Sequence, residues 1–156
     1  MTPMLLQKTL KDELELLFRD FYSSGDAEFE RKKVSIYEQN LPLDTETEDE
    51  NARCPYIIIR LSEGEMEQRD AAELVTVILI FSSKDSNWNQ HGYKDILNMI
   101  QTVKERFLKN PQLGEFFTAE LPMKWVIQEN ETYDIYFGGM ELNFACPAIC
   151  RESRFA

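Results

Sequence analysis

The sequence predicts an α+β fold with a mostly antiparallel sheet and two main amphipathic helices. Segments 3–21 and 92–109 repeat apolar residues at helical spacing, whereas the remaining apolar runs are short and rich in β-branched and aromatic residues. These segments follow the order α, a short β, then β-β-α-β-β, without the regular alternation of a doubly wound sheet. With 156 residues, the chain has the length of one domain, and we expect residues 1–156 to form a single unit.

Both helices are marked at their ends as well as by their apolar stripes. Thr2 and Pro3 are typical of an N-cap and a first helical position, and Ser23-Ser24-Gly25 ends the first pattern. The second helix follows Gly92 and ends at Asn110-Pro111. The stripes comprise Leu6, Leu10, Leu14, Leu17 and Phe21 in the first helix and Tyr93, Ile96, Ile100, Val103 and Phe107 in the second. Since the other faces are polar, we expect each helix to lay one face on the sheet.

Five strands are predicted from β-branched and aromatic runs. A short edge strand falls at Val34–Tyr37, and two paired antiparallel strands follow, with Ser62-Glu63-Gly64-Glu65 as an interruption between them. A second hairpin follows the second helix, and Gly138-Gly139 within its last strand predicts a bulge or bend. The four longer strands are expected at Tyr56–Leu61, Leu74–Phe81, Met123–Gln128 and Tyr136–Cys146.

The strand Leu74–Phe81 is apolar on both of its faces. A half-exposed antiparallel strand normally alternates with polar residues, so this strand is either central and covered on both sides or faces a partner subunit. Tryptophan is enriched at interface hot spots; we expect Trp88, among polar neighbours, at an interface and Trp125 in the core. The candidate interface residues are therefore Val75, Val77, Leu79, Phe81 and Trp88.

The chain is strongly acidic, with 17 basic and 28 acidic residues and a formal net charge of −11. Such a surface repels a phosphate backbone, which disfavours specific nucleic-acid binding. Segment 42–53 is expected to be a solvated, mobile loop, and its acids are Asp44, Glu46, Glu48, Asp49 and Glu50. The longest apolar run is far shorter than the ~20 residues of a membrane span, so we expect no membrane-crossing segment.

The residues do not form a recognisable catalytic or metal-binding pattern. His91 is the single histidine and is expected to face solvent or cap a helix, since a hydrolase triad also needs a positioned nucleophile and an acidic orienter. Cys54, Cys146 and Cys150 lack the second cysteine pair of a structural zinc site. We expect a buried thiol at Cys146, less constrained thiols elsewhere, no enzyme activity, no metal and no cofactor.

Three stretches resemble small tail proteins of long-tailed bacteriophages of Gram-positive hosts, of the tail-terminator or tail-completion type. They run from Cys54 to Leu61 (CPYIIIRL), from Gly92 (GYKDIL) to Pro111 and from Tyr136 (YFGGM) to Pro147. The resemblance implies an α+β subunit that forms a ring, typically a hexamer, on the tail tube, stops tube growth and docks to the head connector. It implies assembly in the bacterial cytoplasm and then a place in the virion, and it supplies no catalytic residues.

Other hypotheses stay open. The chain could be a small-molecule-binding or regulatory domain without catalysis, which would require a concave apolar cavity. A small hydrolase that pairs His91 with a carboxylate would require a buried cleft around that residue. Within the ring hypothesis, the acids of Asp44–Glu50 would line or rim a DNA passage, and the alternative is a plain solvated loop.

Overall fold

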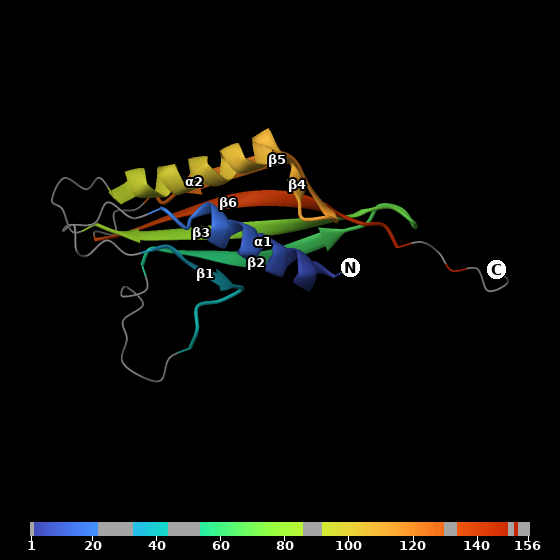
Figure 1. Ribbon diagram of the computed structural model, residues 1–156, viewed down its shortest axis with the longest axis horizontal. Helices are drawn as coiled ribbons and strands as arrows, with labels where there is room; N and C mark the ends of the chain where they lie inside the picture. The colour runs from blue at the N-terminus through green and yellow to red at the C-terminus, as the bar shows by residue number, and fades with distance from the viewer. Residues whose placement is uncertain are drawn as a thin grey trace.

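The computed structural model describes residues 2–21, 33–43, 54–85, 92–129, 134–149 and 152. It confirms the α+β class, with two helices and one six-stranded sheet (Figure 1). The helices are α1 (Pro3–Leu17) and α2 (Gly92–Lys109). The strands are β1 (Ser35–Glu38), β2 (Tyr56–Glu65), β3 (Glu73–Lys84), β4 (Gln112–Leu113), β5 (Phe117–Ile127) and β6 (Ile135–Cys146).

The sheet has the order β1-β2-β3-β6-β5-β4. The short strand β1 pairs in parallel with β2 and forms one edge, and every other pair is antiparallel. The two expected hairpins, β2–β3 and β5–β6, are therefore confirmed. The two-residue strand β4 was missed, because a segment this short carries no periodic signal.

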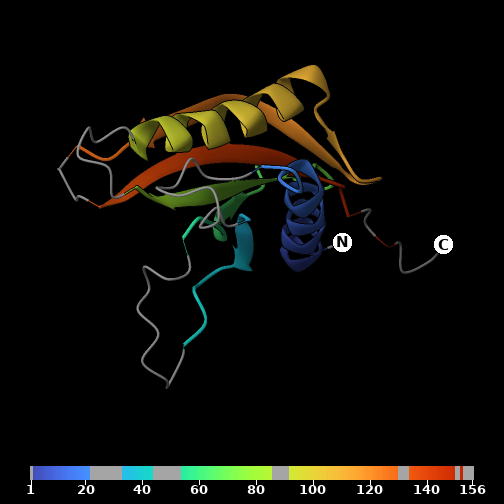
Figure 2. The same cartoon turned by 60° about the vertical axis from the view of Figure 1, so that its left-hand side comes forward.

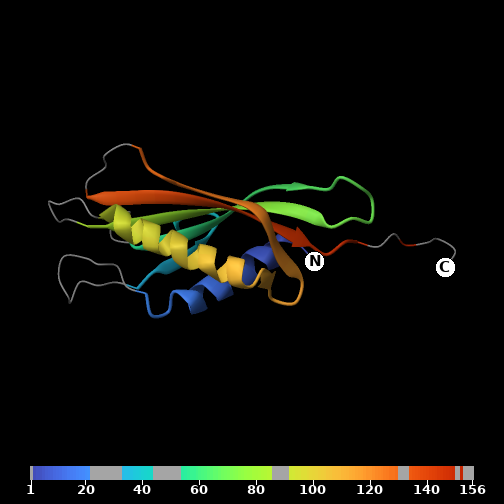
Figure 3. The same ribbon diagram turned by 90° about the horizontal axis from the view of Figure 1, so that it is seen from above.

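Both helices pack on the same face of the sheet (Figure 3). Helix α1 contacts β1 and β2, and α2 contacts β3, β5 and β6 (Figure 2). Apart from Tyr93, which is 40% exposed, the apolar stripes of both helices join the sheet in one core cluster that includes Leu10, Met99 and Phe144. The amphipathic patterns thus predicted correctly that each helix lays one face on the sheet.

Helix α1 begins as its sequence predicts and ends earlier. Thr2 is the N-cap, and its Oγ1 accepts a hydrogen bond of 3.3 Å from the Leu5 N–H. The helix ends at Leu17, and the chain then turns through Phe18, which is buried and makes an edge-to-face contact with Phe21 at 5.3 Å between ring centroids. Phe21 still packs on the core although it lies outside the helix.

Three strands are longer than expected, and one of them, β3, extends from Glu73 to Lys84 instead of Leu74–Phe81. Strand β2 continues through the predicted interruption at 62–65, with a register shift between Leu61 and Glu63. These polar residues are exposed, but their main chain still pairs with β3. Their polarity therefore reflects their exposure to solvent and does not mark the end of the strand. Strand β5 begins at Phe117, and its register shifts between Glu120 and Lys124.

The bulge predicted at Gly138-Gly139 is wrong. Both glycines pair in continuous register with β3 and β5. A Cβ atom on Gly138 would lie 2.4 Å from Cγ2 of Ile96, so the missing side chain serves the close approach of α2 to β6.

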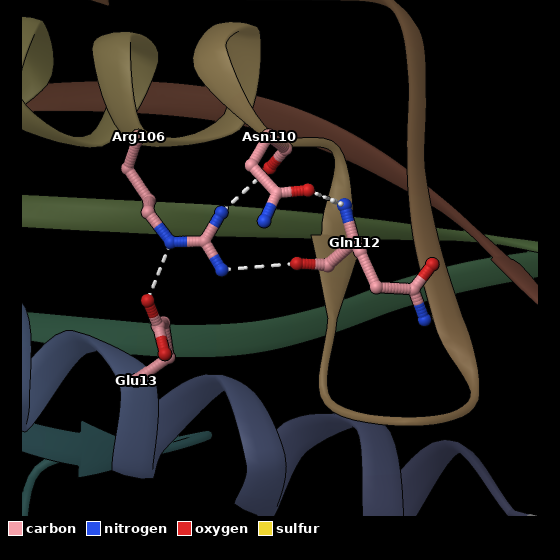
Figure 4. Close-up of polar contacts among 4 residues, drawn as sticks. All are labelled: Glu13, Arg106, Asn110 and Gln112. Atoms are coloured by element: carbon pink, nitrogen blue, oxygen red, sulfur yellow. Dashed lines mark hydrogen bonds and ion pairs between the residues drawn. The ribbon is translucent and has the colours of Figure 1, made fainter.

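One arginine ties the two helices to the segment that follows α2 (Figure 4). Nε of Arg106 forms an ion pair with Glu13 of α1. Its terminal nitrogens donate to the carbonyl oxygens of Asn110, at 2.6 Å, and Gln112, at 2.9 Å. The guanidinium group also lies 4.9 Å from the ring centroid of Phe107. Because the carbonyls at a helix C-terminus lack intrahelical donors, Arg106 satisfies one of them while it fixes α1 against α2.

We predict that Gly138→Ala lowers the free energy of unfolding by about 1–3 kcal/mol, because the added Cβ overpacks the contact with Ile96. The measurement is urea denaturation. Gly139→Ala is the matched control, since a Cβ there meets its nearest atom, Cγ2 of Val126, at an ordinary 3.6 Å. Equal losses from the two substitutions would contradict the proposed role of Gly138.

Arg106→Met should cost about 2 kcal/mol of stability, because it leaves partly buried Glu13 and two carbonyl oxygens without this donor. Lys109→Met is the control: Lys109 pairs with Glu105 at 4.0 Å on an exposed surface, where such pairs contribute little. Thermal unfolding of both variants checks this prediction, and a smaller loss for Arg106→Met than for Lys109→Met would refute it.

Candidate functional site

The two faces of β3 have different environments. Val75, Val77, Leu79 and Phe81 are at most 2% exposed and belong to the main core. They were predicted as interface residues, and this prediction is wrong because both helices pack on their side of the sheet. A partner could not reach them without displacing the helices.

The opposite face of β3 lacks a helical cover in the described part of the chain. Leu74 is 38% exposed, and Ile78 and Ile80 are half-buried. Phe137 of β6, opposite Ser82 in register, is 37% exposed, and Val126 of β5, opposite Gly139, is 66% exposed. We call this surface, formed by Leu74, Ile78, Ile80, Val126 and Phe137, the open face.

A second, smaller cluster covers one end of this side of the sheet. It consists of buried Cys54, Tyr56 and Ile58, with Tyr37, Leu41, Ile80 and Ile135 packed against it. Tyr37 and Tyr56 meet edge to face at 6.2 Å between ring centroids. The chain therefore covers the β1 end of this side itself, and the exposed apolar residues lie toward β5 and β6.

A polar connection crosses the same side of the sheet. Thr76 donates through Oγ1 to Oδ1 of Asn143 at 2.8 Å, and Nδ2 of Asn143 donates to the Pro122 carbonyl at 3.0 Å. Thr76 and Asn143 are buried and directly opposite each other in the β3–β6 register. Asn143 thus holds the irregular part of β5 against the sheet, which explains why a polar residue interrupts the apolar run of β3.

A surface groove of about 270 Å³ lies beside β5. The residues that line it include Ile78, Trp125 and Val126, together with Lys124 of β5 and Glu141 of β6, which face each other. Trp125 was predicted in the core and is 46% exposed, so that prediction is wrong. The reason is that β5 lies near the edge of the sheet, where β4 covers only its first two residues.

Of the two cysteines in the described residues, Cys54 is more constrained than expected. Cys146 is buried as predicted, and burial, followed by the nearby charge of Glu73, raises the pKa of its thiol, which favours the neutral form. Cys54 is also buried, with its Sγ 3.0 Å from Oγ of Ser82, so the less constrained environment predicted for it is wrong. Among the described residues, no group of three or more His, Cys, Asp and Glu side chains is placed to hold a metal ion.

The other predicted site residues lie outside the described residues. These are Trp88, His91, Cys150 and the acids Asp44, Glu46, Glu48, Asp49 and Glu50. The hypothesis of an acidic channel or rim therefore stays a prediction. Within the described ranges, neither helix is long and apolar enough to span a membrane.

Sequence reasoning missed the open face because β3 offers two apolar faces that look alike. The alternation shows that Leu74, Ile78 and Ile80 share one face and Val75, Val77 and Leu79 the other, but it does not indicate which face the helices cover. Thr76 was the available signal. A polar residue in the middle of a buried strand is more often on the less covered side.

Asn143→Ala should lower the free energy of unfolding by about 1–3 kcal/mol, because Thr76 and the Pro122 carbonyl both lose a buried partner. The substitution should also increase the rate of amide hydrogen exchange more in β5 than in β2. Glu141→Ala, two residues away on the same side of β6, is the control. A loss of stability without faster exchange in β5 would show that Asn143 does not position this strand.

The chain was also compared with known proteins. No model of a protein family matches it, and no curated protein sequence matches it. The open face and the β5 groove therefore have to be interpreted from their own geometry and chemistry.

Proposed function

We propose that this chain is a non-catalytic structural subunit of a bacteriophage tail, of the tail-terminator or tail-completion kind, which assembles with copies of itself and with tail proteins. The observation that carries the proposal is the open face. The uncovered side of the sheet carries exposed apolar residues among polar ones such as Glu141 and Lys124, and sheets normally bury their apolar residues against another layer. A neighbouring subunit would supply that layer.

The surface chemistry supports a protein partner. The chain has a net charge of −11, whereas the open face is formed by five apolar residues. An exposed apolar patch surrounded by polar residues is typical of an interaction site. Self-association through such a patch against a different surface of the next copy produces a ring when the rotation closes.

The positions of the phage-like stretches also support the proposal. The three stretches that resemble tail proteins form most of β2, α2 and β6. Strands β2 and β6 flank β3, and α2 packs on β3 and β6, so the resemblance covers the centre of the fold and two of the strands around the open face. By this resemblance, the other partners would be the tail-tube protein and the head connector.

The test is assembly of tail tubes in vitro. The proposal expects the gene to lie beside genes for capsid, connector and tube proteins, and the tube protein from that genome supplies the substrate. With this chain present, electron microscopy should show tubes of limited length with a ring at one end. Leu74→Glu with Phe137→Glu should remove the rings and restore unlimited growth, because the charges would be buried in the contact.

Leu16→Glu is the matched control, because Leu16 is an exposed residue of α1 away from the open face. It should leave rings and tube length unchanged. Uncapped tubes with the unsubstituted chain, or a gene among metabolic genes, would contradict the proposal. A folded chain that binds no tube but binds a small molecule would favour the ligand-binding alternative.

A further inference from the structure

The two edges of the sheet differ in what they offer to another strand. On the β1 side, Gln39 follows the short strand β1 with a positive φ of 65° and places its side-chain amide against β2. Its Oε1 accepts from the Leu61 N–H at 3.0 Å, and its Nε2 donates to the Leu61 carbonyl at 3.2 Å. Gln39 therefore occupies the main-chain groups of Leu61 in β2 just beyond β1, so that another strand cannot pair with β2 there.

In the described part of the chain, the other edge is open along most of β5. Strand β4 pairs only with Phe117 and Thr118. The Ala119 N–H donates outward to the Pro111 carbonyl, whereas the Gln128 N–H donates inward to Phe137 of β6. Main-chain groups alternate in direction along a regularly paired strand, and Lys124–Ile127 pair with β6 without a register shift. Counted back from Gln128, Trp125 and Ile127 therefore direct their N–H and C=O groups away from β6.

Pro122 does not block this edge. It lies in the irregular part of β5, before the regularly paired Lys124–Ile127, and its carbonyl accepts from the side chain of Asn143. A proline interferes with strand addition only where its missing N–H would face the incoming strand. The outward-facing positions 125 and 127 are not proline.

The side chains of this edge are suited to a second copy of the chain. Residues 123–127 contain one charge, Lys124, and no acid, although the whole chain carries −11. Lys124 faces Glu141 of its own sheet, so this edge adds little charge repulsion between two copies. Trp125 and Val126 are 46% and 66% exposed.

We infer that two copies of this chain pair through their β5 edges, antiparallel about a two-fold axis at Trp125, so that one sheet continues across both chains. In this register Trp125 lies opposite Trp125 of the second copy, Met123 lies opposite Ile127, and Lys124 lies opposite Val126, which keeps the two lysines apart. Because Gln39 occupies the main-chain groups of Leu61 in β2, β5 pairs with β5 and not with β2. This pairing goes beyond the proposed function and describes the isolated chain.

Sedimentation velocity over a range of concentrations tests the pairing. The unsubstituted chain should show a monomer–dimer equilibrium. Trp125→Glu should raise the dissociation constant at least tenfold, because it places two carboxylates at the two-fold axis. Phe116→Glu, in the exposed turn before β5, is the control and should leave the equilibrium unchanged. A chain that stays monomeric at every concentration would overturn the inference.

A cross-linking test remains decisive if Trp125→Glu fails to fold. In a Cys150→Ser background that keeps buried Cys54 and Cys146, Trp125→Cys should form an intermolecular disulfide on mild oxidation. Residues directly opposite in an antiparallel pair have Cα atoms about 4.5–5.5 Å apart, within the range of a disulfide. Leu121→Cys should not cross-link, because residue 121 lies away from the axis. Cross-linking at 121 and not at 125 would refute this register, and neither result depends on tail assembly.

Discussion

The rest of the structure depends on the burial of one face of β3. Val75, Val77, Leu79 and Phe81 belong to the single core cluster that also contains the buried residues of both helices, and the neighbouring strands β2 and β6 add side chains to the same layer. Burial of large apolar side chains is the main favourable term in folding, and each contributes about 1.5–3 kcal/mol. Both helices pack on this side of the sheet. The opposite face of β3, which is also apolar, must therefore be buried against something else.

Helices cover one side of the sheet and not the other, and this difference is the basis of the proposed assembly. The chain covers the β1 end of the second face with Tyr37 and Leu41, and a polar link from Thr76 through Asn143 to Pro122 holds β5 in place. Leu74, Val126 and Phe137 remain exposed. The sheet thus offers two different surfaces, the open face and the β5 edge, which share Val126 and otherwise use different residues.

The sequence predicted the elements well where a local physical signal existed. Thr2 and Pro3 marked the start of α1, and the β-branched runs marked the four main strands. The choice of face on β3 was not predictable, because it depends on where two distant helices pack. Gly138 was interpreted locally as a bulge, whereas its role comes from contact with Ile96 of α2. Trp125 was assigned to the core from strand membership alone, although edge position decides its exposure.

The most direct measurement of the central claim is hydroxyl-radical footprinting of the chain alone at low concentration and of the complete assembly on tail tubes. Our account predicts that labelling of Leu74 and Phe137 falls on assembly, while labelling of Met4 and Leu16 on α1 stays the same. Unchanged labelling of Leu74 and Phe137, with protection of the α1 residues instead, would contradict a functional role for the open face.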